Sequence, residues 1–267
     1  MSGSAQKIPC TVGMVVRNGG LALRSAMELV KDFAEIILCD GNSTDDTREI
    51  AHGFGARVIP QDSHYLDPTG RIKNFSGVWN QVRDAGSYDW FFCLCADEYI
   101  PPELIAEIRQ AVAGEPAVYW MPRKYVYRGV VIECAITYPT QQYRVFHRDV
   151  TGQYVKEIHE HIEINKGVVP KYFKHAQLAD MDDSVLELMQ KWRRYIALER
   201  RRRGKTSLRW WVPMAVHEVG IAGLYTLRLV RVRLFCKGAR LPLRFDFARI
   251  WYQFALVWGL FKTVRHF

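Results

Sequence analysis

Residues 36–47 read IILCDGNSTDDT, and residues 90–98 read WFFCLCADE. In each stretch a short apolar run ends in acidic residues, which is typical of a buried strand that delivers carboxylates to its C-terminal end. Ligands of open α/β sheets bind in the crevice at those strand ends. The two stretches therefore predict a ligand site, with a nucleotide on one side and a metal-bound diphosphate on the other.

The surrounding segments alternate between strand and helix patterns as far as residue 112. The predicted strands span residues 11–16, 36–39, 56–59 and 90–94. The predicted helices span residues 23–30, 44–51, 75–86 and 102–112. This order predicts an α/β fold with a mixed, mostly parallel sheet flanked by helices. Shorter strands, rich in β-branched and aromatic residues, are expected to extend the sheet at residues 119–127, 142–146 and 158–164.

The acidic residues at the two strand ends suggest specific chemistry. A carboxylate at Asp40 can accept a hydrogen bond from a nucleobase N–H, and Gly41 lets the backbone approach the ligand closely. Asp97 and Glu98 directly follow an apolar run, so a positive group must offset their desolvation. Mg²⁺ or Mn²⁺ on a substrate diphosphate would supply that charge. Plain strand ends before capped helices are the alternative, since caps favour the same residue types.

Basic and amide side chains precede the second acidic stretch. Arg71, Lys73 and Asn74 begin the predicted helix at residues 75–86, and there they could bind a diphosphate at the helix N-terminus. Exposed cations with no ligand are the alternative interpretation.

The segment His159-Glu160-His161 combines two possible metal ligands with a carboxylate. Strand alternation places the two histidines on one face and Glu160 on the other. His159 could complete a metal shell, and Glu160 or Glu157 could act as a general base. Half-buried histidines without a ligand role are the alternative.

The cysteines and the N-terminus indicate the compartment. The six cysteines are Cys10, Cys39, Cys93, Cys95, Cys134 and Cys236. They show no zinc-type spacing, and we interpret them as small hydrophobic side chains in a reducing cytoplasm. The polar start of the chain is unlike a signal peptide, which places the predicted catalytic part in the cytoplasm.

Charge divides the chain into two parts. Residues 184–267 hold 18 Lys/Arg and 4 Asp/Glu, a net +14, whereas residues 1–183 hold 19 and 24, a net −5. We therefore predict a catalytic domain at residues 1–183 and a basic, aromatic helical region at residues 184–267 that associates with an anionic membrane surface. Charged residues interrupt every apolar run of this region, which argues against a simple transmembrane helix. Nucleic acid and ordinary packing of a helical subdomain are the alternatives.

Taken in order, these motifs resemble the family 2 inverting glycosyltransferases of GT-A fold. The resemblance is closest to the bacterial branch that builds β-linked sugars in lipopolysaccharide cores and related surface glycans. It covers roughly residues 8–205. The matching segments are residues 12–18, 40–47, 73–74, 89–90, 96–98, 143–146 and 158–160.

The resemblance implies a nucleotide-sugar donor whose base lies near Asp40. Asp97, together with His159, would hold Mg²⁺ or Mn²⁺ on the diphosphate. Glu160, or else Glu157, would deprotonate the acceptor hydroxyl, which attacks the anomeric carbon and inverts it. The other donor-binding residues that it implies are Val16, Asn18, Asn42, Ser43, Asp45, Arg71, Lys73, Asn74, Cys95 and Ala96.

Two positions depart from the family pattern. Cys95 stands where the family usually has the first acid of Asp-Ala-Asp-Glu, and Thr140 stands where related sequences often carry an acid. The leading hypothesis is a metal-assisted inverting glycosyltransferase with a lipid-linked or lipopolysaccharide-type acceptor, peripheral or monotopic at the cytoplasmic side of the inner membrane. A nucleotide-sugar-binding protein of the same fold without activity, and a nucleic-acid-binding protein, are the alternatives.

Overall fold

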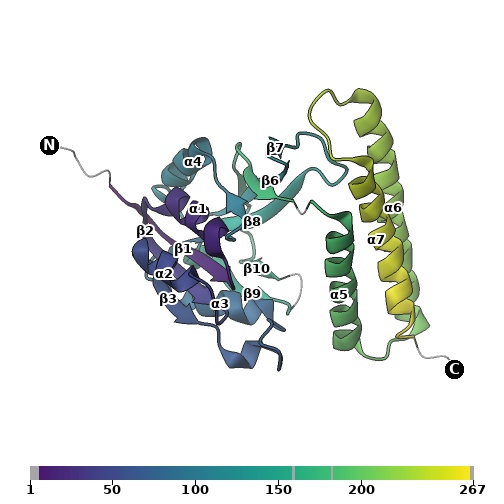
Figure 1. Ribbon diagram of the computed structural model, residues 1–267, viewed down its shortest axis with the longest axis horizontal. Coiled ribbons are helices and arrows are strands. Elements are labelled where there is room, and N and C mark those ends of the chain that lie inside the picture. The colour runs from purple at the N-terminus through teal and green to yellow at the C-terminus, as the bar shows by residue number, and fades with distance from the viewer. Residues whose placement is uncertain (1–5, 158–159, 182, 265–267) are drawn as a thin grey trace. The chain divides into compact units, whose positions relative to one another are not determined.

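A computed structural model describes residues 6–157, 160–181 and 183–264 (Figure 1). The chain forms two compact units. The first comprises Met1–Arg123 and Thr140–Ala179, and the second comprises Lys124–Pro139 and Asp180–Phe267. Residues 124–139 therefore leave the first unit in mid-chain and join the C-terminal helices.

Four parallel strands form the first part of the sheet. They are β1 (Ile8–Val16), β2 (Phe33–Asp40), β3 (Arg57–Pro60) and β4 (Trp90–Cys93), in the order β3-β2-β1-β4. The helices that connect them are α1 (Gly20–Val30), α2 (Thr47–Gly53) and α3 (Phe75–Ala85), with the short 3₁₀ helix η1 (Ser63–Tyr65) before α3. The strand order reverses at β1, which is the topological switch point where ligands of such sheets bind.

Further strands continue this sheet beyond β4. The full order is β3-β2-β1-β4-β8-β6-β12-β5, and β8 (Thr140–His147) pairs antiparallel with β4 and with β6 (Val118–Tyr127). The shorter strands are β5 (Glu98–Tyr99), β7 (Val130–Val131), β11 (Lys171–Tyr172) and β12 (Gln177–Asp180). Helix α4 (Pro102–Val112) follows β5, and the 3₁₀ helix η2 (Arg148–Val150) follows β8. The predicted α/β class, with helices flanking a mostly parallel sheet, is confirmed.

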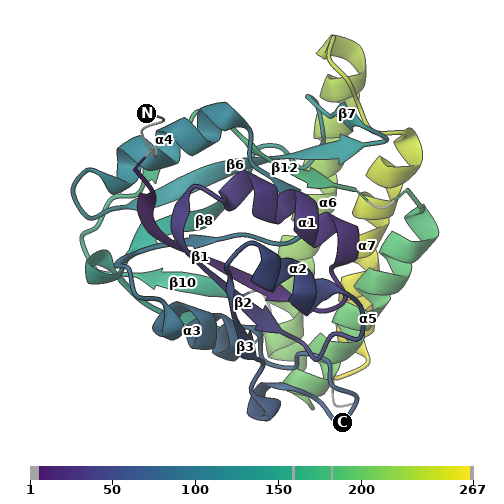
Figure 2. The ribbon, with the colours of Figure 1, turned by 60° about the vertical axis from the view of Figure 1, so that its left-hand side comes forward.

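The two faces of the sheet carry separate cores, because alternate residues of a strand point to opposite faces. Helices α1, α2 and α4 cover one face, and α1 and α2 lie in front of β1 and β2 in Figure 2. The buried residues of that core include Val12, Met14, Leu23, Ile50 and Leu104. Helix α3 covers the other face with the hairpin of β9 (Thr151–Val155) and β10 (His161–Ile164). The buried residues there include Ile37, Cys39, Val82, Phe91 and Ile162.

Three long helices form most of the second unit. They are α5 (Val185–Arg203), α6 (Leu208–Phe235) and α7 (Leu243–Phe261). The Ser184 hydroxyl caps α5 by accepting the N–H of Glu187. The indole N–H of Trp211, near the start of α6, donates to the carbonyl of Val257, near the end of α7, at 3.1 Å. These two helices therefore run antiparallel. None of the described helices is long and apolar enough to cross a membrane.

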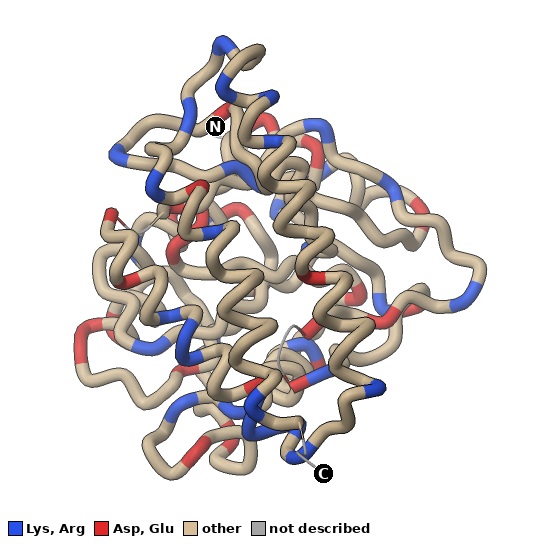
Figure 3. The backbone as a smooth tube through the Cα atoms, turned by 90° about the vertical axis from the view of Figure 1, so that its right-hand side faces the viewer, with Lys and Arg blue, Asp and Glu red and all other residues tan. Residues whose placement is uncertain are grey.

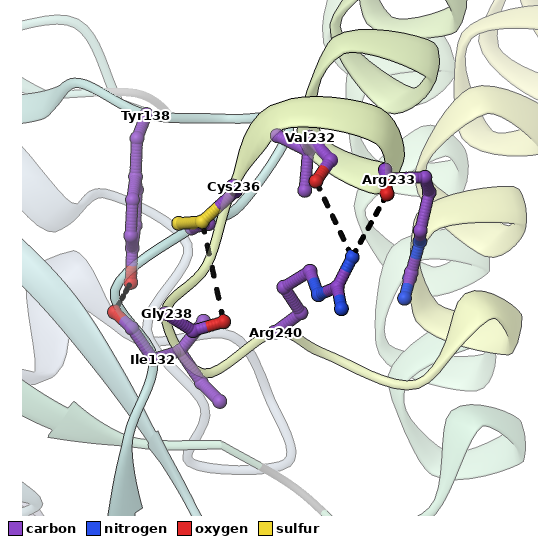
Figure 4. Close-up of a disulfide and its surroundings, with 8 residues drawn as sticks. Ile132, Tyr138, Val232, Arg233, Cys236, Gly238 and Arg240 are labelled. Atoms are coloured by element: carbon purple, nitrogen blue, oxygen red, sulfur yellow. Dashed lines mark hydrogen bonds between the residues drawn. A yellow bond between two sulfur atoms is a disulfide. The ribbon is translucent and has the colours of Figure 1, made fainter.

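A disulfide links Cys134 to Cys236 within the second unit, with a Cα–Cα distance of 6.5 Å (Figure 4). Beside it, Ile132 and Ala135 pack with Leu241 and Phe245. The interpretation of all six cysteines as free side chains is therefore wrong for this pair. The two residues are 102 positions apart, and only the excursion of residues 124–139 into this unit brings them together.

Gly13 in the middle of β1 has no room for a side chain. A Cβ atom there would lie 2.2 Å from the ring of Phe91 and 2.8 Å from Val82. We expect Gly13→Ala to lower the free energy of unfolding by about 1–3 kcal/mol, because it overpacks a fully buried core. Urea unfolding followed by circular dichroism measures this. In Gly53→Ala, the control, the new Cβ meets no heavy atom within 4 Å, so stability should not fall. An equal loss in both variants would contradict this packing.

Candidate active site

The carboxyl ends of β2, β1 and β4 meet at one edge of the sheet. Val16 lies opposite Asp40 in the β1–β2 register, and Gly13 lies opposite Cys93 in the β1–β4 register. The segments that follow these strands leave the sheet together at this edge. The structure thus brings the two acidic stretches to either side of β1.

Asp40 ends β2 with only 4% of its surface exposed. Its carboxylate accepts the Nε–H of Arg48 at 2.6 Å and the backbone N–H of Ser43 at 3.2 Å. A cavity of about 450 Å³ opens beside it, with His52 and Gln61 also in its lining. A carboxylate has about four acceptor positions, so Asp40 keeps capacity for a ligand N–H.

The loops after β1 and β2 hold each other in place. The backbone N–H of Asn18 donates to the Ser43 hydroxyl at 2.8 Å, and the Asn18 side chain accepts the N–H of Thr44 at 2.9 Å. Asn18 and Asn42 both adopt left-handed backbone conformations, with φ of 54° and 60°, which asparagine tolerates. The hydroxyl of Thr47 donates to Asp45 and lowers the pKa of that carboxyl. Several predicted donor-binding residues therefore shape the loop itself.

Glu98 is buried between two arginines, with 1% of its surface exposed. Its carboxylate lies 2.9 Å from Arg144 and 3.4 Å from Arg123, and it also accepts the backbone N–H of Cys95 at 2.9 Å. The expectation that a metal offsets the charge of Glu98 is therefore wrong, since the protein supplies its own cations. Asp97, by contrast, is exposed in the turn between β4 and β5.

Cys95 shares the surroundings of Glu98 but carries no charge. Arg144 Nη1 lies 3.1 Å from the sulfur of Cys93 and 3.9 Å from that of Cys95. Burial raises the pKa of Cys93 to about 11, and burial and the neighbouring Glu98 raise the pKa of Cys95 above its usual value. Both thiols therefore stay protonated at neutral pH, so Cys95 cannot supply the charge of the acid it replaces.

A second cavity, of about 510 Å³, lies beside Cys95. Ile72 and Phe75 line it, so the start of α3 borders the cavity, and Glu160 lies in its wall. Glu157 is exposed, and its backbone carbonyl accepts the N–H of Phe75 at 2.9 Å. The structure thus brings Glu160, Cys95 and the start of α3 together. His159 lies outside the described residues.

The predicted diphosphate-binding residues lie at the entrance to α3. Asn74 caps the helix: its side-chain oxygen accepts the N–H of Gly77 and the hydroxyl of Ser76, both at 2.9 Å. Lys73 and Arg71 are exposed just before it. Of the remaining predicted residues, Val16 is the buried last residue of β1, and Ala96 packs partly against the core.

The described residues do not form a complete metal shell by themselves. Among the described residues, no three His, Cys, Asp or Glu side chains gather closely enough to hold one. The exposed carboxylate of Asp97 fits a Mg²⁺-type ion, which is commonly bound by one or two carboxylates, substrate phosphates and water.

Sequence reasoning missed the roles of two arginines. Arg144 occupies a segment that carries the family resemblance, yet nothing in the spacing shows that it neutralises Glu98. Arg48 is the second residue of α2, and its pairing with Asp40 depends on how the loop between β2 and α2 folds. In both cases the only indication in the sequence of an ion pair was a single cation together with the acidic clusters.

The sequence signature of glycosyl transferase family 2 matches residues 11–175. The chain belongs to this family, and the predicted family and GT-A-like fold are confirmed. No curated protein sequence matches the chain significantly.

Similar solved structures include glucosyl-3-phosphoglycerate synthase from Mycobacterium tuberculosis in complex with Mn²⁺, UDP and glucosyl-3-phosphoglycerate. Its identity is 23% and its TM-score 0.33, over 45% of this chain and 44% of the synthase. Mannosyl-3-phosphoglycerate synthase from Rubrobacter xylanophilus is 18% identical with a TM-score of 0.34, over 45% of this chain and 40% of that one. The chain thus spans less than half the length of these synthases.

The adjacent acids Asp97 and Glu98 should respond differently to removal. Glu98→Ala leaves Arg144 buried beside two neutral thiols, so we expect a loss of about 3–5 kcal/mol in the free energy of unfolding. Asp97→Ala should change it by no more than about 0.5 kcal/mol, because the side chain is exposed. Chemical denaturation measures both, and Glu98→Gln, which keeps the shape of the side chain, provides an intermediate if Glu98→Ala does not fold. Equal effects at both positions would contradict the assignment.

Proposed function

We propose that this glycosyltransferase moves a sugar, with inversion, from a nucleoside-diphosphate sugar to a hydroxyl of a lipid-linked or lipopolysaccharide-type acceptor. One observation supports the donor most directly: the segments of Asp40 and Asp97 leave the sheet on either side of β1, and each has a cavity nearby. A nucleotide laid across this edge would place its base at Asp40 and its phosphates near Asp97.

Each residue of the site has a distinct part in this proposal. Asp40 accepts the N–H of the base, and Lys73 with Arg71 neutralises phosphate charge at the start of α3. Asp97 would hold Mg²⁺ or Mn²⁺, which when bound stabilises the negative charge on the departing diphosphate. Glu160, in the wall of the second cavity, accepts the proton of the acceptor hydroxyl. Attack from the face opposite the leaving group inverts the anomeric carbon.

The neutral thiol of Cys95 supports a second candidate. With Cys95 protonated and Glu98 paired to arginines, Asp97 is the remaining acid of this turn for a metal. A protein that binds the nucleotide sugar without transferring it would fit this loss of charge. Turnover with an acceptor separates the two candidates.

The surface of α6 supports a membrane-bound acceptor. Apolar side chains at helical spacing are exposed along its length, namely Leu208, Val212, Val216, Val219, Leu227, Val230 and Leu234. Soluble proteins rarely expose such a continuous apolar surface unless it meets a partner. Lys and Arg gather toward the ends of α6 and α7, and α6 carries none between residues 210 and 227 (Figure 3). An apolar stripe flanked by cations suits an anionic membrane interface. We propose a peripheral or monotopic location there, on the cytoplasmic side of the inner membrane, although a disulfide such as Cys134–Cys236 is rare in that compartment.

Donor binding can be tested by thermal unfolding with a panel of nucleoside diphosphates, each with and without Mn²⁺. One nucleotide at a hundred times its dissociation constant should stabilise the protein by about 2.7 kcal/mol. Asp97→Ala should remove the part of this gain that depends on Mn²⁺, and Asp40→Ala should weaken binding with or without the metal. Folded protein that responds to no nucleotide would refute the proposal.

Membrane binding can be tested by sedimentation with anionic vesicles. Leu227 and Leu234 are 71% and 70% exposed on α6, and Leu186 is 71% exposed on α5. Leu227→Gln with Leu234→Gln should weaken binding by roughly a hundred-fold, because each inserted leucine contributes about 1.5 kcal/mol or more. Leu186→Gln is the control and should have little effect. Unchanged binding of the double variant would exclude the α6 stripe as the membrane-facing surface.

A further inference from the structure

The second unit contains a basic cavity that the sugar-transfer chemistry does not use. It lies where α5 ends and the chain leaves α7, with a volume of about 1050 Å³. Four cations line it, namely Arg200, Arg201, Lys205 and Lys262, together with the hydroxyl-bearing Thr263. None of its described lining residues is acidic.

Neighbouring arginines on the same helix turn are already paired. Arg202 and Arg203 lie 3.1 Å and 2.6 Å from the carboxylate of Glu199, and Arg203 also stacks on Trp210. Within the described part of the chain, no Asp or Glu carboxylate forms such an ion pair with any of the four cavity cations. In the last turn of α5, Arg202 and Arg203 are therefore neutralised by Glu199, whereas Arg200 and Arg201 can bind an anion from outside the chain. Gathered cations repel one another, so an anion that binds among them relieves this repulsion.

An apolar cleft adjoins the basic cavity along α7. Its volume is about 270 Å³, and its walls are Trp211, Phe254, Val257, Trp258 and Phe261. Phe261 of the cleft directly precedes Lys262 of the cavity, and the Lys262 ammonium lies 5.9 Å from the ring centre of Trp258. Trp258 is 64% exposed and Phe254 50% exposed, so the cleft opens to the surface.

We propose that this pair of cavities binds one phosphorylated membrane lipid, with its phosphate among Arg200, Arg201, Lys205 and Lys262 and its acyl chain along the cleft of Trp211 and Trp258. Guanidinium and ammonium groups are the side chains that bind phosphate oxygens most strongly. The adjoining cleft favours a lipid over a soluble phosphate, because an acyl chain gains free energy by leaving water. The protein would thus bind one specific lipid at the membrane surface. This inference rests on the membrane location in the proposed function.

The test compares two double variants of the full chain that remove equal charge from α5. Arg200→Gln with Arg201→Gln alters the cavity. Lys191→Gln with Arg194→Gln is the control, at exposed positions outside the cavity lining. Binding of the unaltered chain and of both variants is measured on phosphatidylcholine vesicles, with and without phosphatidic acid, at one ionic strength. Phosphatidic acid should strengthen binding of the unaltered chain. The cavity variant should lose about a hundred-fold of that affinity, because two charge-assisted hydrogen bonds to the phosphate are removed. The control variant should lose much less.

Three results would overturn the proposal. Equal losses in the two double variants would show diffuse attraction to charge in place of a site. Binding that ignores phosphatidic acid would exclude a lipid phosphate. Inorganic phosphate that stabilises the unaltered chain but not the cavity variant, and that leaves vesicle binding unchanged, would assign the cavity to a soluble phosphate. Nucleotide binding at Asp40 and Asp97 is measured separately, so failure of the donor site and failure of this lipid site are distinguishable.

Discussion

The buried ion pair of Glu98 and Arg144 is the interaction on which the candidate site depends. A carboxylate that is almost fully buried is stable only with well-placed partners, and Glu98 has Arg144, Arg123 and the N–H of Cys95. These contacts fix the turn that follows β4. They also give the two adjacent acids different roles: Glu98 stabilises the turn from inside, and Asp97 is exposed to solvent. The ligand-binding edge is therefore built on a buried charge pair, and Arg144 of that pair also lines the second cavity.

Much of the first unit could be predicted from local pattern. The apolar runs that end at Asp40 and at Cys93 form the parallel strands β2 and β4, each paired with β1, since intervening helices leave few other topologies. The helix predicted at residues 102–112 likewise matches the bounds of α4. What remained hidden depended on contacts distant in sequence. The Arg144–Glu98 pair spans 46 residues and the Cys134–Cys236 bond spans 102, and no periodicity encodes either.

The replacement of an acid by Cys95 has a physical consequence that sequence alone could not decide. A cysteine beside an arginine can lose its proton, yet here burial and the nearby Glu98 keep the thiol neutral. At this turn the described residues offer a metal one exposed carboxylate, so we expect the substrate diphosphate to supply further ligands. Such a site would be assembled by the donor itself, so that metal and nucleotide bind as a unit.

The most direct measurement is a calorimetric titration of Mn²⁺ into the protein, alone and saturated with the nucleoside diphosphate that stabilises it most. We expect tight Mn²⁺ binding with one ion per chain only when the nucleotide is present, and we expect Asp97→Ala to abolish it. Equally tight Mn²⁺ binding without nucleotide, or undiminished binding in Asp97→Ala, would contradict this expectation.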